Sequence, residues 1–270
     1  MIQELGNYKY DDTFKIMTPK KGDYLVFISD NKILLDEGYN LPRYDDDFSG
    51  YQFIYLFCVN ENKFFYCDKR IEEYGNFKYV NFHSKIRVHE KWLTFAISTA
   101  YHFADWYRNN RYCGRCGKEN LLATNERMIY CEKCHTFIYP RINPAVIVAV
   151  IDRENDSVIV TKRTPTSTGY ALISGFCEVG ETVEETCVRE VYEEVGVSIK
   201  NIKYYKSQPW AYSESLLLGF VAELDGDNIL KVDYNENTDA FWIKRSDLDI
   251  KNDDFSLTRE MLDEFAKGNL

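Results

Sequence analysis

Residues 175–197 contain three glutamates whose spacing places them on one face of a helix. Glu190, Glu193 and Glu194 stand at positions i, i+3 and i+4, and such side chains are neighbours on a helix surface. Like charges this close destabilise an isolated helix, so the grouping needs a physical reason. An apolar stripe runs beside them: Val183, Cys187, Val191 and Val195. The sequence therefore predicts a helix over 181–195 that packs against a core and lines its rim with carboxylates, which suits hard divalent cations that bridge phosphate oxygens.

The same segment matches the Nudix box, G-x5-E-x7-R-E-U-x-E-E-x-G-U, at every defined position, where U is an apolar residue. The matching residues are Gly175, Glu181, Arg189, Glu190, Val191, Glu193, Glu194, Gly196 and Val197. At about 7% for each fixed residue, a chance match has a probability of about 10⁻⁹ at any start position. The alternative interpretation, a solvated acidic helix face, does not account for this agreement.

Residues 141–270 thus resemble the Nudix hydrolase family, and the resemblance implies an α/β/α sandwich. It also implies hydrolysis of a nucleoside diphosphate linked to another group, in which Mg²⁺ or Mn²⁺ activates a water that attacks one phosphorus. Glu194 is then the base or water-positioning carboxylate, and Glu190 and Glu193 are metal ligands. We expect Arg189 to orient these carboxylates rather than to touch substrate.

Two CxxC pairs, separated by 14 residues, lie in residues 111–140: Cys113 and Cys116, then Cys131 and Cys134. Four thiolates suit a tetrahedral Zn²⁺, and each CxxC turn supplies two of them from one loop. A redox CxxC would occur once beside a βαβ unit, so we predict one structural zinc per chain in a zinc ribbon. The five bases and three acids of this segment leave a net charge of only +2, which favours a folding role over nucleic-acid binding, although the charge could steer an anionic ligand.

A third motif follows the acidic helix. Residues 207–215 read SQPWAYSES and resemble SQPWPFPxS, the array that marks NADH pyrophosphatases within the Nudix family. The four-cysteine ribbon and the run from Tyr139 to Ala145 resemble the same subgroup. Ala211, Tyr212 and Ser213 depart from the usual Pro, Phe and Pro, which predicts a less rigid loop and puts dinucleotide selectivity in doubt. Without the box, the array would read as a turn and a core tryptophan. The implied substrate contacts are Gln208, Pro209, Trp210, Ala211, Tyr212, Ser213, Glu214 and Ser215.

The resemblance adds further positions. Glu236 matches a late metal carboxylate, and Ser174 matches a metal contact through its backbone carbonyl. Because the family builds its site across a homodimer, we expect a homodimer in which the ribbon reaches the partner's nucleotide. The residues implied in substrate binding outside the array are Glu126, Tyr139, Thr258 and Arg87.

The first 110 residues carry no motif with a recognisable chemistry. Short β-branched and aromatic runs predict strands near 24–28, 32–35, 52–59 and 63–67, and three- and four-residue apolar spacing predicts a helix over 91–110. The expected fold class is therefore α+β or α/β, with a small N-terminal β-rich domain (1–110), a four-cysteine zinc ribbon (111–140) and a C-terminal Nudix sandwich (141–270).

The net charge of −10 disfavours nonspecific nucleic-acid binding by a basic surface. Residues 175–197 contribute −6 of it, seven glutamates against Arg189, so much of the imbalance belongs to the predicted metal site. The longest purely apolar stretch, Ala145 to Ile151, is far shorter than the roughly 18 residues of a membrane span. The cysteine pattern and the absence of a signal-like start favour the cytoplasm.

The leading functional hypothesis is hydrolysis of NADH and NAD⁺ to nicotinamide mononucleotide and AMP, together with removal of NAD caps from RNA 5′ ends. The alternatives are a broader ADP-ribose-type pyrophosphatase and a non-catalytic nucleotide-binding module. Free dinucleotide and capped RNA both stay open as substrates, and Mg²⁺ and Mn²⁺ both stay open as cations.

Overall fold

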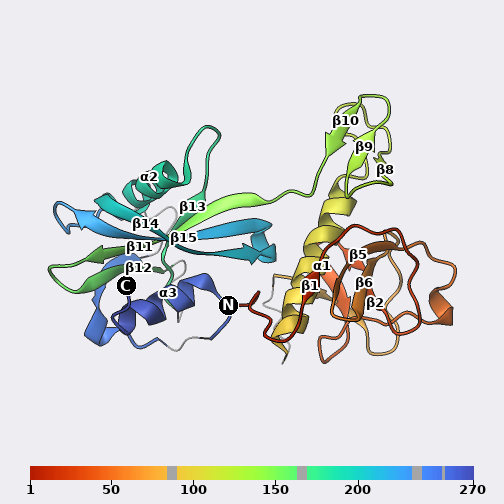
Figure 1. The fold of residues 1–270 in the computed structure, drawn as a ribbon, viewed down its shortest axis with the longest axis horizontal. Coiled ribbons are helices and arrows are strands. Elements are labelled where there is room, and N and C mark those ends of the chain that lie inside the picture. The colour runs from red at the N-terminus through yellow and green to blue at the C-terminus, as the bar shows by residue number, and fades with distance from the viewer. Residues whose placement is uncertain (84–89, 163–168, 233–238, 251–252) are drawn as a thin grey trace. The chain divides into compact units, whose positions relative to one another are not determined.

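A computed structural model describes residues 1–83, 90–162, 169–232, 239–250 and 253–270. The chain divides into two compact units, one formed by residues 2–141 and the other by residues 142–270 together with Met1 (Figure 1). No helix in the described ranges is long and apolar enough to cross a membrane.

The C-terminal unit is built on a six-stranded sheet in the order β14-β15-β11-β12-β16, with β13 also paired to β11. The central strand β11 contains the apolar run Ala145 to Ile151, which is buried, and β12 returns antiparallel to it. The strands are β11 (Asn143–Asp152), β12 (Ser157–Lys162), β13 (Ile173–Phe176), β14 (Ser198–Trp210), β15 (Ser215–Asp225) and β16 (Asp239–Lys244).

Two helices cover opposite faces of this sheet (Figure 1). They are α2 (Val183–Val195) and α3 (Leu257–Ala266). Side chains alternate along β11, so Val146, Val148 and Val150 pack with the apolar stripe of α2, whereas Ile147, Ala149 and Ile151 pack with α3. These two clusters are called the α2 core and the α3 core below. The expected α/β/α sandwich is confirmed.

The N-terminal unit contains a four-stranded sheet in the order β1-β5-β6-β2 and a three-stranded sheet in the order β3-β4-β7. The predicted helix is present as α1 (Lys91–Asn109), and a ribbon of β10-β9-β8 follows it. The strands are β1 (Tyr10–Asp11), β2 (Tyr24–Val26), β3 (Ile28–Ser29), β4 (Lys32–Leu35), β5 (Ile54–Val59), β6 (Asn62–Tyr66), β7 (Lys78–Asn81), β8 (Leu121–Leu122), β9 (Ile129–Cys131) and β10 (Thr136–Ile138).

Candidate active site and metal centre

The acidic helix α2 has well-defined ends. Thr182 is the N-cap: its hydroxyl accepts from the Glu185 backbone N–H, and the Glu185 carboxylate accepts from the Thr182 backbone N–H. This capping box moves the start of the helix to Val183, two residues after the predicted start. At the other end Gly196 adopts a left-handed conformation with φ of 68°, which glycine tolerates without a Cβ penalty.

The three box glutamates differ in their exposure. Glu190 and Glu194 are 8% and 4% exposed, whereas the side chain of Glu193 is 55% exposed. All three nevertheless project from the same side of α2, as their spacing predicts. The helix therefore offers two sheltered carboxylates and one that faces solvent.

Arg189 connects the carboxylates of the box. Its Nη1 donates to Glu190 Oε1 at 2.7 Å and to Glu193 Oε2 at 3.0 Å. Its Nε donates to Glu181 Oε1 at 2.6 Å, and its Nη2 donates to Glu181 Oε2 at 2.9 Å, which makes a two-bond fork. Nη2 also donates to the Phe176 carbonyl. The Arg189 guanidinium therefore offsets the like charges on this face of the helix and orients the carboxylates, as we expected from the sequence.

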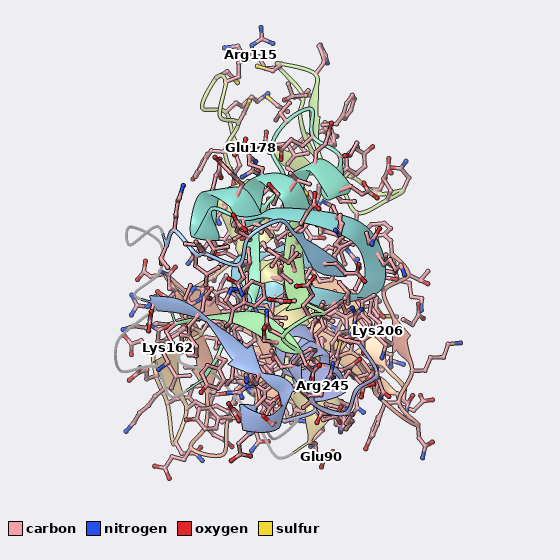
Figure 2. The ribbon with its side chains drawn as sticks, turned by 90° about the vertical axis from the view of Figure 1, so that its left-hand side faces the viewer. Glu90, Arg115, Lys162, Glu178, Lys206 and Arg245 are labelled. Atoms are coloured by element: carbon pink, nitrogen blue, oxygen red, sulfur yellow. The ribbon has the colours of Figure 1, made fainter. Side chains whose placement is uncertain are left out.

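Glu181 anchors the loop that enters α2. Besides the Arg189 fork, its Oε2 accepts from the Thr186 hydroxyl at 3.0 Å and from the backbone N–H of Glu178, the residue labelled in that loop in Figure 2. These bonds, that from Arg189 first, lower the pKa of Glu181 from 4.5 to about 2. Glu181 thus stays ionised over the working range of pH.

This pKa shift predicts a pH dependence for Arg189→Met. A carboxyl group whose pKa is depressed in the folded state stabilises it above its unfolded pKa of 4.5, and that stabilisation is lost as the pH falls towards about 2. We therefore expect the variant to unfold at lower urea than the wild type at about pH 6, and the difference to shrink steadily below about pH 4.5. Urea titrations followed by circular dichroism in metal-free buffer measure it.

Arg153→Met is the matched control, because Arg153 pairs with Glu223 at 3.2 Å on the same unit but is half exposed. Exposed pairs of this kind contribute little, so the control should lie close to the wild type at every pH. A destabilisation by Arg189→Met that is the same at low and neutral pH would contradict the assignment.

Strand β13 brings backbone against the two sheltered carboxylates. The Ser174 N–H donates to Glu194 Oε1 at 3.1 Å. A Cβ placed on Gly175 would lie only 1.9 Å from the Glu190 carboxyl carbon, so any larger residue there would displace the Glu190 carboxylate. The Glu190 and Glu194 carboxylates thus lie beside neighbouring residues of one strand, and carboxylate oxygens suit a hard divalent cation such as Mg²⁺ or Mn²⁺.

The SQPW array lies at the end of a long strand rather than in a turn. Ser207 to Trp210 complete the edge strand β14, in which Pro209 pairs with Leu216 of β15. Proline is tolerated there because an edge strand has one side without ladder bonds. Residues 211–213 then form a short 3₁₀ turn.

Two aromatic rings of the array meet a third that the sequence did not identify. The Trp210 ring centroid lies 5.0 Å from that of Tyr212 and 5.6 Å from that of Phe255, which precedes α3. The Tyr212 and Phe255 centroids are 6.4 Å apart. We call these three residues the aromatic triad. Phe255 is 45 residues from Trp210 in sequence, so only the fold brings them together.

The other predicted contacts of the array are placed around its turn. The Ser213 and Ser215 hydroxyls are 2.9 Å apart, and Ser215 Oγ also donates to the Ser213 carbonyl. The Glu214 carbonyl accepts from the Asn143 N–H at 2.8 Å, which ties the turn to β11. Gln208 is fully buried, Pro209 is exposed, and Ala211 is half-buried.

The remaining predicted site residues fall into three groups. Thr258 lies in the first turn of α3, three residues after Phe255. In the ribbon, the Tyr139 hydroxyl donates to Glu126 Oε1 at 3.5 Å, and both side chains are exposed. Glu236 and Arg87 lie outside the described residues.

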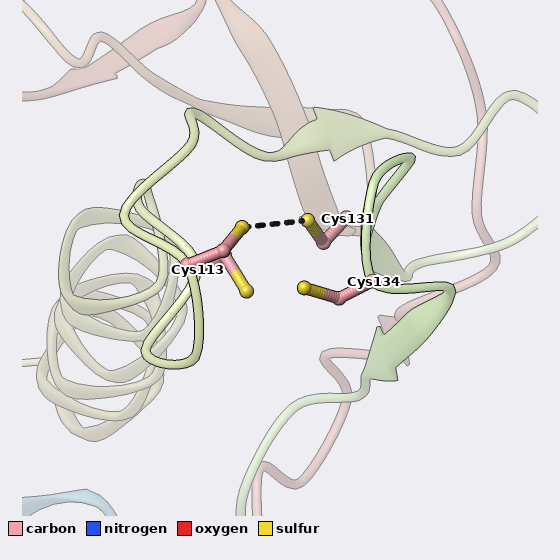
Figure 3. A group of neighbouring side chains, drawn as sticks. Cys113, Cys131 and Cys134 are labelled. Atoms are coloured by element: carbon pink, nitrogen blue, oxygen red, sulfur yellow. Dashed lines mark hydrogen bonds between the residues drawn. The ribbon is translucent and has the colours of Figure 1, made fainter.

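The four cysteines of the two CxxC pairs converge (Figure 3). Their Sγ atoms all lie within 4.8 Å of one another, although the pairs are far apart in sequence, and Cys116 Sγ lies 3.6 Å from Cys131 Sγ. Hydrogen bonds from the backbone N–H groups of Arg115 and Cys116 lower the pKa of Cys113 to about 6, as in a knuckle whose amides face the sulfur. A cluster of four soft thiol ligands fits tetrahedral zinc.

Two family models match the parts of the chain in which these groups lie. The model described as "NUDIX domain" matches residues 141–265, which includes α2, β13 and the aromatic triad. The C-terminal unit is a Nudix domain. The model described as "NADH pyrophosphatase zinc ribbon domain" matches residues 108–139, so the four cysteines form a zinc ribbon of that type.

Curated proteins that are similar to this chain carry the name "NAD-capped RNA hydrolase NudC". Those of Escherichia coli K12 and Shigella boydii serotype 18 are each 36% identical over 162 residues, which is 60% of this chain and 62% of theirs. The match thus spans less than two thirds of these relatives. Among solved structures, a NUDIX hydrolase from Nitrosomonas europaea is 24% identical, with a TM-score of 0.47 over 58% of this chain and 90% of that one.

Proposed function

We propose that the protein hydrolyses the pyrophosphate bond of NADH and NAD⁺, releasing nicotinamide mononucleotide and AMP, and that it removes NAD caps from RNA 5′ ends. The observation that carries the proposal is the joint presence, in one chain, of an intact Nudix carboxylate site and a zinc ribbon of the NADH pyrophosphatase type. The name of the curated relatives supports the same chemistry.

In this proposal Glu190, Glu193, Glu194, the Ser174 carbonyl and Glu236 hold divalent cations, either Mg²⁺ or Mn²⁺. Such cations supply a nucleophilic water and neutralise charge on the phosphates. Glu194 accepts the proton of that water, and the Ser174 N–H holds its carboxylate in place. Arg189 keeps Glu190 and Glu193 oriented through its paired hydrogen bonds.

The SQPW array forms the substrate side of the proposed site. The rings of Trp210 and Tyr212 offer faces on which a planar base of the dinucleotide stacks. Residues 209–215 and Thr258 line this side in the proposal, and Arg87 stays a predicted substrate contact that the family resemblance implies. Glu126 and Tyr139 of the ribbon contribute to nucleotide binding in a homodimer, which size-exclusion chromatography with light scattering would detect.

The same observations support two broader proposals about the chain. The first is that the chain has three functional parts: an N-terminal domain (1–110), a zinc ribbon (111–140) and a Nudix domain (141–270). We also propose that the enzyme works in the cytoplasm, because none of its eight cysteines is in a disulfide and the ribbon requires reduced thiols.

A second candidate is a broader pyrophosphatase that also accepts ADP-ribose. Ala211 and Ser213 replace two prolines of the NADH pyrophosphatase array, so the turn at residues 211–213 lacks the fixed φ that proline imposes. A less rigid turn would discriminate less between dinucleotides. The ratio of kcat/KM for NADH to that for ADP-ribose separates the candidates, because only a selective NADH enzyme gives a ratio far above one.

The proposal is tested by incubating purified full-length protein with NADH or NAD-capped RNA, in parallel with Mg²⁺ and with Mn²⁺. We expect AMP and nicotinamide mononucleotide from NADH, and RNA with a 5′-monophosphate from capped RNA. Binding of NADH without any AMP release, with either metal, would overturn the proposal and favour a non-catalytic binding module.

A further inference from the structure

The aromatic triad is more exposed than a structural core would be. The rings of Trp210, Tyr212 and Phe255 are each half-buried, and all three lie outside the α2 core and the α3 core. The Trp210 and Phe255 ring planes meet at 79°, and those of Trp210 and Tyr212 at 51°. The three rings therefore meet one another tilted or edge-on and not in parallel stacks, and the face of a partly exposed ring is a place where a flat base can stack.

Gln208 is placed differently from the three rings. It is fully buried, with 0% of its surface exposed, so it has no surface to offer a ligand. Its Nε2 donates to the Phe255 carbonyl at 2.8 Å, and its Oε1 accepts from the Leu257 N–H at 2.8 Å. The amide therefore clamps the backbone on both sides of Ser256, which is the N-cap of α3.

A second contact fastens α3 to the same strand. Glu260 is buried on α3 and accepts from Lys206 Nζ at 2.5 Å and from the Tyr205 hydroxyl at 2.9 Å. Lys206 is labelled in Figure 2. The start of α3 is thus held against residues 205–208 of β14 at two places, and Phe255 lies at the end nearer the array.

We infer that Phe255 is a specificity-determining residue that forms the third wall of a base-binding subsite with Trp210 and Tyr212, and that Gln208 is its positioning residue. The ligand is a heteroaromatic base of a nucleotide, either the nicotinamide or the adenine of the dinucleotide. This inference rests on the proposed function. The motif resemblance implied that Gln208 contacts the substrate directly. We infer an indirect role instead, because the Gln208 amide is fully buried and can influence the substrate only through the residues it bonds.

The first experiment uses Phe255→Leu, which removes the ring and keeps an apolar side chain at a half-buried position. Loss of one base-stacking partner should raise KM for NADH about tenfold and leave kcat within about twofold. If the nicotinamide stacks there, KM for ADP-ribose should not change; if the adenine does, it should rise equally. Phe255→Tyr should restore the wild-type KM.

Tyr204→Leu is the matched control, since Tyr204 is a partly exposed aromatic residue on the same strand, 58% exposed and packed on Phe220. This variant should leave kcat and KM for NADH unchanged. Unchanged KM values for NADH and ADP-ribose in Phe255→Leu would overturn the inference.

Product binding keeps this test separate from the proposed function. Titration of the wild type and of Phe255→Leu with AMP and with nicotinamide mononucleotide, followed by calorimetry, needs no turnover. A wild type that releases no AMP from NADH, but binds one product about tenfold more tightly than Phe255→Leu, would refute the proposed function and support the subsite. Equal affinities in the two proteins for both products would refute the subsite.

The positioning role of Gln208 is tested by a double-mutant cycle. Gln208→Met removes both amide bonds and should reproduce the KM increase of Phe255→Leu with little change in kcat. Because Gln208 acts through Phe255, the KM of the double variant should be no higher than that of the single variant with the higher KM. Gln208→Glu, which keeps an acceptor for the Leu257 N–H, replaces Gln208→Met if that protein does not fold. Two results would overturn the positioning role of Gln208: KM increases of the two single variants that multiply in the double variant, or a fall in kcat at constant KM in Gln208→Met.

Discussion

Replacing Glu194 with glutamine is expected to lower kcat for NADH hydrolysis by about 10³-fold, within the range that general base residues contribute. Glu194 is 4% exposed and accepts the Ser174 N–H, and the amide oxygen of glutamine accepts the same bond. The side chain therefore keeps its place, but an amide cannot take a proton from water. AMP release measured at saturating NADH and Mn²⁺ gives kcat, and thermal unfolding reports whether the fold is kept.

Glu184→Gln is the matched control for this experiment, because Glu184 lies on the same helix but in its exposed first turn. It removes the same charge and should keep wild-type kcat. Glu194→Gln with a kcat within about threefold of the wild type would contradict the assignment of Glu194 as base.

Replacing Cys131 with serine is expected to abolish zinc binding and to unfold the ribbon. The ribbon strands β8, β9 and β10 hold two or three residues each, and Leu121 and Leu122 are exposed, so this segment buries little apolar surface. Zinc must supply the missing stability, which in zinc-finger peptides is about 10–16 kcal/mol of apparent binding energy. Zinc content per chain and proteolysis within residues 111–140 measure the loss.

Cys58→Ser is the control for Cys131→Ser. Cys58 is a half-buried thiol on β5, and it is not one of the four clustered cysteines. This variant should keep one zinc per chain and wild-type protease resistance. Cys131→Ser that still binds one zinc per chain would show that the ion is held elsewhere.

The parts of the structure that depend on local spacing were predictable from the sequence. The face shared by Glu190, Glu193 and Glu194 follows from 3.6 residues per turn, and the two CxxC pairs carry their ligands within single loops. The apolar run 145–151 predicted the buried centre of the sheet, because a strand covered on both faces has no polar side.

Other features had no local signal. The thirteen residues of β14 mix charged, aromatic and apolar side chains, because an edge strand with irregular pairing alternates weakly between core and solvent. Phe255 follows an acidic segment, and its sequence context does not distinguish it from other aromatic residues in loops. Nothing in its neighbours indicates that Gln208, 47 residues earlier, bonds its carbonyl.

The sequence by itself identified the candidate groups for the chemistry: the box carboxylates with Arg189, and the four thiols. The identity and spacing of these groups are properties of short segments, and a short segment can adopt few local conformations. Only the tertiary structure decided what surrounds them. It set Gly175 against the Glu190 carboxylate, left Glu193 open to solvent while it covered Glu194, and brought Phe255 to Trp210. These contacts join residues far apart in the chain, and their geometry depends on how α2 and α3 pack on opposite faces of one sheet.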